Sequence, residues 1–213
     1  MSHENSPSSD LPIRELGAQP YWHQGAVRRD VVSLSESPRY EGRFHVAGGP
    51  AVWYASSTQQ AAWAELFRHF LDAGVDPFEV RRRVARVRVE GLRVLDLTND
   101  AVRRVVGITI GELMGDDYES CQRLAQLARE QGFDGVLSPS AALTESTTLV
   151  VFDVATEKIE IERSNVTTPP PRLADLLSRV RLHRDVPGVV RGFVRILEAL
   201  GSDAIRLRRR RQD

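Results

Sequence analysis

The chain has 213 residues, and its 29 basic and 29 acidic side chains give a formal net charge of zero. Hydrophobic residues make up 41% of the sequence, which is ordinary for a globular protein and excludes a wholly disordered chain. The lone cysteine, Cys121, excludes a disulfide framework and a cysteine-based zinc cluster, and no apolar run is long enough to span a bilayer.

The chain begins with a polar segment, residues 1–18, that is rich in serine and proline and has no hydrophobic period. We expect a flexible arm here, and because it lacks the apolar core of a signal peptide we expect a cytoplasmic protein. The turn signal Gly48–Pro50 introduces the apolar run 51–55, which predicts a buried strand. Thr58 is expected to cap an amphipathic helix that runs to about residue 71.

The middle of the chain predicts β structure followed by short helices. Residues 78–97 are rich in valine and leucine, and Gly91 divides them with a turn. Asn99 or Asp100 can cap a short helix that ends near residue 106.

A longer helix is expected next, capped by Asp116 or Asp117 and running through Glu130, with Gly132 as its C-terminal stop. Three short strands are expected after it, over residues 135–137, 149–154 and 159–161. This mixture of strands and helices predicts an α+β fold with a mixed or antiparallel sheet, and no glycine-rich phosphate loop is present.

The C-terminal region has a different character. Pro169–Pro171 predicts a stiff linker, and residues 173–182 and 189–200 predict two helices. The second helix carries an apolar stripe, which either packs on the protein's own domain or docks a partner. We therefore divide the chain into a flexible arm (1–18), a central domain (19–163) and a helical extension with a basic tail (164–213).

Three residues spaced eleven apart, Arg43, Tyr54 and Glu65, are candidates for a functional site. Glu65 stands between Trp63 and Phe67, unusually apolar neighbours for a carboxylate. One interpretation is a surface salt bridge or an ordinary helix-face glutamate. The other is a carboxylate held in a dry pocket, where it stabilises a developing positive charge.

Ser138 and Ser140 follow a predicted strand, where a serine hydroxyl can bind a ligand or simply form a turn around Pro139. A serine nucleophile is not expected, because the chain has no Gly-x-Ser-x-Gly elbow there. Asp116 and Asp117 fit a helix cap better than a metal site, and the five histidines show no metal-ligand spacing, so we expect no metal.

Two blocks of motifs, taken together, resemble the RES domain, a family named for an Arg-Glu-Ser set that supplies toxins of bacterial toxin–antitoxin pairs. The first block is Gly42–His45, Trp53–Ser56 and Ala64–Leu66. The second block follows the order seen in mycobacterial members and is Val94–Thr98, Gly115–Tyr118, Cys121–Gln122 and Gly135–Ala141. The resemblance covers about residues 21–154, so 19–163 would be the RES catalytic domain.

The resemblance implies a fold like that of diphtheria-toxin-type ADP-ribosyltransferases, with no resident cofactor and with NAD⁺ as the substrate. Family members break the nicotinamide–ribose bond with phosphate or water as acceptor, so an NAD⁺ phosphorylase or glycohydrolase is expected. The alternatives are a mono-ADP-ribosyltransferase acting on a protein and a non-catalytic interaction module. The implied partner is a cognate antitoxin with a helix-turn-helix domain, through which the toxin meets DNA only indirectly, in a homodimer or a larger assembly.

By the same resemblance, Arg43 would neutralise the pyrophosphate and Tyr54 would stack on nicotinamide or its ribose. Glu65 would bind the ribose hydroxyls and stabilise the oxocarbenium-like sugar, while Ser140 would hydrogen-bond ribose or a phosphate oxygen. Ser138 is a further candidate for substrate binding.

The chain departs from the family at one position, since many members carry an arginine directly after an aromatic residue near the domain start. Here Trp22 follows Tyr21. If that arginine grips phosphate in relatives, His23, Arg28 or Arg29 could substitute for it in this chain.

Arginine dominates the basic residues, because Lys158 is the only lysine. A GC-rich genome would produce this bias, and a need for planar forks that match phosphate would produce it too. The basic run 206–211 is short and terminal, so we expect it to solubilise the chain or contact the antitoxin rather than bind nucleic acid.

Overall fold

The computed structural model describes residues 11–34, 40–72 and 80–167, which fold as one eight-stranded sheet with helices packed on it. The strands are β1 (Ile13–Leu16), β2 (Gln19–Gly25), β3 (Val52–Ser56), β4 (Arg82–Val89), β5 (Leu92–Asp96), β6 (Gly135–Pro139), β7 (Thr147–Phe152) and β8 (Ile159–Thr167). The helices are α1 (Gln59–Asp72), α2 (Asp100–Val106), α3 (Ile110–Met114) and α4 (Glu119–Glu130), with a 3₁₀ helix at Asp153–Lys158.

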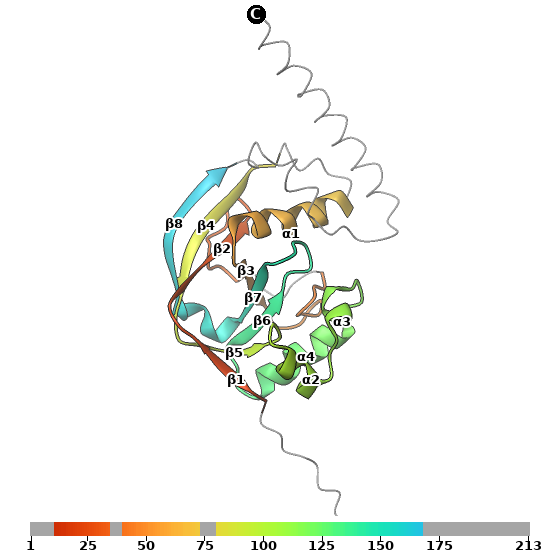
Figure 1. Ribbon diagram of the computed structural model, residues 1–213. Helices are drawn as coiled ribbons and strands as arrows, with labels where there is room; N and C mark the ends of the chain where they lie inside the picture. Colours follow the sequence, from red (N-terminus) through yellow and green to blue (C-terminus); the bar gives the residue numbers. More distant parts are fainter. Residues whose placement is uncertain (1–10, 35–39, 73–79, 168–213) are drawn as a thin grey trace, which may run out of the picture.

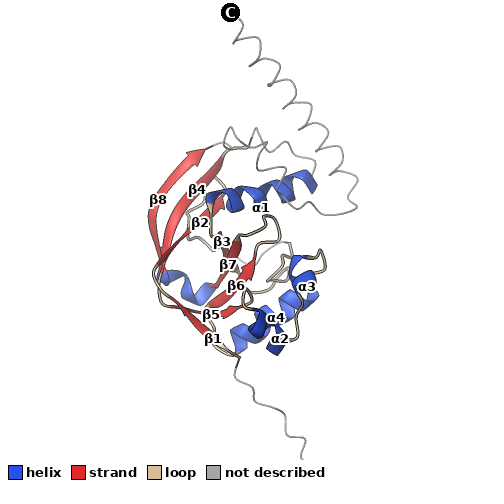
Figure 2. Ribbon diagram, viewed as in Figure 1, coloured by secondary structure: helices blue, strands red, loops and turns tan. Residues whose placement is uncertain are grey.

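The strands lie in the order β1-β5-β6-β7-β3-β2-β4-β8. Neighbouring strands are antiparallel except β5 and β6, which are parallel. The sheet curls strongly, with α1 across one end and α2, α3 and α4 gathered at the other (Figure 1; Figure 2). The predicted α+β class with a mixed sheet is therefore confirmed.

The sheet is nearly split between β2 and β3. These two strands share a single pair, Trp22 with Ser56, whereas β2 pairs with β4 along its whole length and β3 does so with β7. Helix α1 packs against both β2 and β3 beside this split. The split therefore leaves room for a cavity between strands that a continuous ladder would close.

Two clusters of buried side chains hold the sheet. The first joins α2, α3 and α4 to β5, β6 and β7, and it includes Leu95, Leu113, Leu124, Val136 and Phe152. The second lies against β2, β3, β4, β5 and β7, and it includes Tyr21, Trp53, Val87, Leu92 and Leu149. Burying one such large side chain contributes roughly 1.5–3 kcal/mol.

Gly135 lets the central strands approach one another. A Cβ atom there would lie 2.0 Å from the carbonyl oxygen of Val150 on β7, so only glycine fits without moving backbone. Other local predictions are confirmed as well. The Thr58 hydroxyl accepts from the amide of Ala61 at the start of α1, and the Asn99 side chain caps α2.

The structure corrects the predicted boundaries. Residues 11–18, expected as part of the flexible arm, include β1, which pairs with β5 and buries Leu16 to 1% exposure. The four-residue strand is too short and too charged to show a hydrophobic period. Strand β8 crosses the expected boundary at 163 and reaches Thr167, because it pairs with β4 from Ile159 to Thr167 except at a bulge around Glu162.

Several other predicted element boundaries differ from the structure by a few residues, and some predicted elements lie outside the described residues. Helix α4 ends at Glu130 as predicted, but its N-cap is Tyr118 rather than either aspartate. Helix α3 was not predicted, and β7 ends at Phe152 rather than at residue 154. The arm up to residue 10, the proline linker, the two C-terminal helices and the basic tail lie outside the described residues. Among the residues that the structure describes, no helix has the length and apolar character needed to cross a membrane.

Candidate active site

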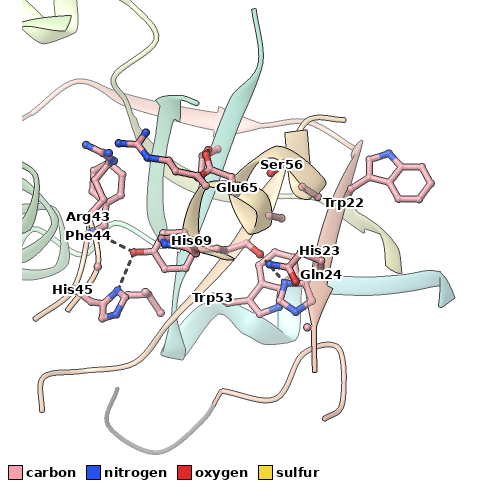
Figure 3. A pocket seen from close by; sticks show the side chains of 18 of the residues that line it. Trp22, His23, Gln24, Arg43, Phe44, His45, Trp53, Ser56, Glu65 and His69 are labelled. Atoms are coloured by element: carbon pink, nitrogen blue, oxygen red, sulfur yellow. Dashed lines mark hydrogen bonds between the residues drawn. The ribbon is translucent and has the colours of Figure 1, made fainter. Parts of the chain in front are cut away.

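A cavity of about 630 Å³ opens where β2 and β3 separate, with α1 on one side and the turn before β3 on the other (Figure 3). Arg43, Tyr54 and Glu65 all line it. The three residues come from a turn, a strand and a helix, so the structure brings together the set that the sequence singled out.

Glu65 reaches the cavity from the sheet-facing side of α1. Its Oε1 accepts a hydrogen bond from the hydroxyl of Ser140 at 2.9 Å and lies 3.4 Å from that of Thr148. The apolar neighbours in sequence, Trp63 and Phe67, stack on each other about 160° away around the helix. The Glu65 carboxylate therefore lies next to the hydroxyls of Ser140 and Thr148. Trp63 and Phe67, its apolar neighbours in sequence, lie on another face of the helix.

Ser140 lies behind Glu65 and is 1% exposed. Besides donating to Glu65, its hydroxyl accepts from the amides of Ala142 (3.2 Å) and Leu143 (3.1 Å). Ser140 does not line the cavity, and in this structure its hydroxyl orients the carboxylate of Glu65; its predicted contact with a ligand stays a prediction. Ser138 is completely buried and donates to the Pro139 carbonyl at 3.2 Å, so the structure does not bring it into the cavity either.

Arg43 sits at the tip of a tight turn that Gly42 and His45 close with two backbone hydrogen bonds, of 2.9 and 3.3 Å. Its Nη1 donates to the Gly115 carbonyl at 2.8 Å, and its guanidinium lies 4.9 Å from the ring centre of Tyr118. Gly42 is needed because a Cβ there would lie 2.3 Å from the His45 imidazole. The turn thus fixes where the guanidinium enters the cavity.

The Tyr54 hydroxyl is held by two partners. It accepts from the amide of Phe44 at 3.2 Å and lies 2.9 Å from Nδ1 of His45, whose Nε2 lies 3.2 Å from the carbonyl of Tyr40. A carbonyl can only accept, so Nε2 carries the ring hydrogen and Tyr54 donates to Nδ1. Burial lowers the pKa of His45 and raises the pKa of Tyr54, which keeps both groups neutral.

His23 bridges the split with its side chain. Its Nδ1 donates to the Tyr54 carbonyl at 2.7 Å, and its ring stacks on Trp53 with 4.9 Å between centres. Burial lowers the pKa of His23, so the ring is neutral at pH 7 and does not replace the charge of an arginine. Of the two other substitutes considered, Arg28 is exposed and away from the cavity, whereas Arg29 lines it.

Sequence reasoning missed a buried arginine, Arg68, three residues after Glu65 on the same face of α1. It is 3% exposed, and it donates to the Ala141 carbonyl at 2.7 Å and to Asp116 at 2.5 Å. Asp116 is therefore an ion-pair partner, while Asp117 accepts from the amide of Glu119. Within the described ranges, no three acidic, histidine or cysteine side chains are grouped so as to hold a metal ion.

We expect the folded protein to lose stability as the pH falls below about 6.5, because burial lowers the pKa values of His23 and His45 from 6.5. Between the folded and unfolded pKa values the unfolded chain binds more protons, so the free energy of unfolding rises with pH. The slope is at most about 1.4 kcal/mol per pH unit for each ring, and smaller for His45, which solvent reaches. Urea unfolding from pH 5 to 8 measures it, and a flat profile from pH 5 to 7 would contradict the assignment.

Comparison with known proteins gives consistent matches. The model of the RES domain family matches residues 14–187. The probable NAD(+) phosphorylase Rv3189 of Mycobacterium tuberculosis is 53% identical over 190 residues, which are 89% of this chain and 91% of that protein. The NAD(+) phosphorylase MbcT of Mycobacterium bovis is 33% identical over 125 residues, which are 57% of this chain and 66% of that protein.

Among solved structures, a chain in the crystal structure of the M. tuberculosis MbcT–MbcA toxin–antitoxin complex is similar with a TM-score of 0.66. The two chains are 26% identical, and the match covers 78% of this chain and 91% of the other. The similarity therefore extends to the fold as a whole.

Proposed function

Because the chain belongs to the RES domain family, we propose that it is a toxin that cleaves NAD⁺ between nicotinamide and ribose, with inorganic phosphate as acceptor and water as a lesser one. The relative matched over nine-tenths of its length, named a probable NAD(+) phosphorylase, supports this activity. The observation that carries the proposal is that Arg43, Tyr54 and Glu65 line one cavity from three different elements.

The chemistry requires little proton transfer. As the bond between C1″ and the pyridinium nitrogen breaks, its electron pair neutralises nicotinamide, which leaves without a general acid. The sugar becomes oxocarbenium-like, and a phosphate oxygen forms the new bond to C1″. Hydrogen phosphate carries two negative charges and NAD⁺ contributes one positive charge at nicotinamide, so the reaction balances as ADP-ribose-1″-phosphate and neutral nicotinamide.

Each side chain has a role that follows from its position. The Glu65 carboxylate faces the sugar and offsets the positive charge that develops there. Arg43 offers its remaining N–H groups to the pyrophosphate. Tyr54, with its hydroxyl engaged by Phe44 and His45, presents a fixed ring against which nicotinamide or its ribose packs.

Replacing Ser140 with alanine is expected to lower kcat by about tenfold while leaving KM for NAD⁺ unchanged, since the hydroxyl orients Glu65 without reaching the cavity. The variant also leaves two amides without their acceptor, so we expect it to be less stable by about 1–3 kcal/mol. Ser120→Ala, which removes a surface hydroxyl bonded to Glu112, is the control. A raised KM with unchanged kcat would instead mean that Ser140 binds the substrate.

The partner and the finer fold assignment belong to the same proposal. We propose a cognate antitoxin with a helix-turn-helix domain, in a homodimer or larger assembly, and a fold of the diphtheria-toxin ADP-ribosyltransferase type. The similarity to a chain of a toxin–antitoxin complex supports the partner, and the cavity in a split sheet is consistent with the fold. The N-terminal arm and the C-terminal helical extension with its basic tail, predicted as 1–18 and 164–213, stay part of the proposal where they lie outside the described residues.

One experiment tests the activity. Purified protein is incubated with NAD⁺, with and without phosphate, and the products are separated by chromatography with mass detection. We expect ADP-ribose-1″-phosphate and nicotinamide when phosphate is present and slower release of ADP-ribose when it is absent. Transfer of ADP-ribose to an added lysate protein, with no soluble sugar product, would favour the protein ADP-ribosyltransferase instead.

A further inference from the structure

The cavity has more cationic groups than the pyrophosphate needs. Its lining includes four arginines, Arg29, Arg43, Arg68 and Arg82. Three carboxylates also line it, Asp30, Glu41 and Glu65. Arg68 is already paired with Asp116 outside this set, and Arg43 is the group assigned to the pyrophosphate. The phosphate acceptor of the proposed reaction therefore requires a second cationic group.

Arg82 has the properties of that group. It lies half-buried at the start of β4, and its Nε donates to Oε1 of Gln24 at 2.8 Å. Across the described parts of the chain, no carboxylate lies within ion-pair distance of it. Burial lowers the pKa of Arg82 from its ordinary value, yet a guanidinium stays charged at neutral pH. A desolvated positive charge is thus compensated only by a neutral amide.

Arg82 and Gln24 both offer hydrogen-bond donors at this place. After the bond to Gln24, both Nη groups of Arg82 remain, and the amide of Gln24, whose oxygen is engaged, offers its NH₂. Exposed Arg29 adds a further guanidinium to the lining. Asp30, next to Arg29, also lines the cavity, so Arg82, Arg29 and Asp30 together keep one net positive charge, which suits an oxyanion with several acceptor oxygens.

Arg82 and Gln24 also lie away from Arg43 in the cavity. Figure 3 shows Gln24 on the opposite side of Glu65 from Arg43, and the bond to Gln24 ties Arg82 to that side. Arg43 holds one anion at one end of the cavity, and the donors at the other end remain for a second. The carboxylate that faces the reacting sugar lies between them.

We propose that Arg82 and Gln24, assisted by Arg29, form the binding site for the inorganic phosphate that accepts the ADP-ribosyl group. This inference rests on the proposed NAD⁺ cleavage, and it assigns the acceptor to residues of this chain. The phosphate oxygen attacks C1″ from this site as the bond to nicotinamide breaks, with no further reactant. When phosphate is absent, water occupies the same space and gives ADP-ribose.

The test compares Arg82→Gln and Arg82→Lys with the wild-type protein in steady-state assays that vary phosphate and NAD⁺ separately. We expect Arg82→Gln to raise KM for phosphate by about 10–100-fold, to leave KM for NAD⁺ within twofold, and to increase the share of ADP-ribose among the products. Arg82→Lys keeps the charge without the fork and should be intermediate. Arg88→Gln, on the exposed part of the same strand, is the control.

Binding of inorganic phosphate alone, measured by calorimetry without NAD⁺, keeps the inference separate from the proposed activity. We expect heat of binding for the wild-type protein and for Arg88→Gln, and none for a folded Arg82→Gln. If the wild-type protein binds phosphate through Arg82 but never cleaves NAD⁺, the proposed function fails and the site stands. A raised KM for NAD⁺ with unchanged KM for phosphate, or unchanged phosphate binding in either Arg82 variant, would overturn the site.

Discussion

Replacing Glu65 with glutamine is expected to lower kcat for NAD⁺ cleavage by about 10²–10³-fold while the fold is kept. The amide has nearly the shape of the carboxylate, and its oxygen can still accept from Ser140 and Thr148. The glutamine side chain lacks the negative charge that offsets the developing oxocarbenium ion. The variant therefore stabilises the transition state less, while its interaction with the bound substrate changes little.

The measurement is single-turnover release of nicotinamide from enzyme in excess over NAD⁺, together with a thermal unfolding curve. Glu130→Gln is the matched control, because Glu130 is also a helix glutamate that accepts one side-chain hydrogen bond, from Gln126, but it lies on the surface. A Glu65→Gln protein that cleaves NAD⁺ at the wild-type rate would remove Glu65 from the chemistry.

Replacing Arg43 with lysine is expected to weaken NAD⁺ binding by about tenfold or more, even though the charge is kept. The guanidinium of Arg43 donates to the Gly115 carbonyl and lies near the ring of Tyr118, and it still has N–H groups to offer to the cavity. Lysine has no planar fork, so it cannot hold these contacts and a phosphate oxygen together.

Calorimetry in the Glu65→Gln background measures this affinity without consuming the ligand. Arg104→Lys, which alters an exposed arginine paired with Asp100 on α2, is the control and should leave the affinity unchanged. Equal NAD⁺ affinity with and without Arg43→Lys would show that another group holds the pyrophosphate.

The parts of the structure that the sequence predicted well are set by local chemistry. The caps at Thr58 and Asn99 and the turn at Gly91, with a φ of 68°, each depend on a few adjacent residues. The set of Arg43, Tyr54 and Glu65 was predicted first from its even spacing and the apolar neighbours of Glu65, and then from the order of the family motifs. These three residues line one cavity because β2 and β3 separate, and no local sequence pattern predicts that separation.

The features that could not be predicted from the sequence depend on contacts between residues far apart in the chain. Ser140 reaches Glu65 across 75 positions, so its positioning role was invisible, and a direct ligand contact was expected instead. The run Arg81–Arg83 is another case. Arg82 lines the cavity, while Arg83 donates to the Val27 carbonyl, and only the register of β4 decides which of the two faces the site.

The narrow join between β2 and β3 has a consequence for the lifetime of the folded chain. The backbone ladder connects β2, β4 and β8 to the other five strands through one residue pair, and the His23 side chain adds one bond. Opening at this join breaks few backbone hydrogen bonds, so what holds the two sides together is the buried cluster that includes Tyr21, Trp53 and Val87. Local opening there requires less free energy than global unfolding. Gln24 and Tyr54 line the cavity from opposite sides of the join, so a bound dinucleotide would act as a non-covalent crosslink, worth about 2.7 kcal/mol when its concentration is a hundred times Kd. Amide hydrogens along the join should therefore exchange more slowly while NAD⁺ is abundant. Loss of NAD⁺ removes this crosslink, so we expect a protease to cut the chain faster without NAD⁺ than with NAD⁺ in excess.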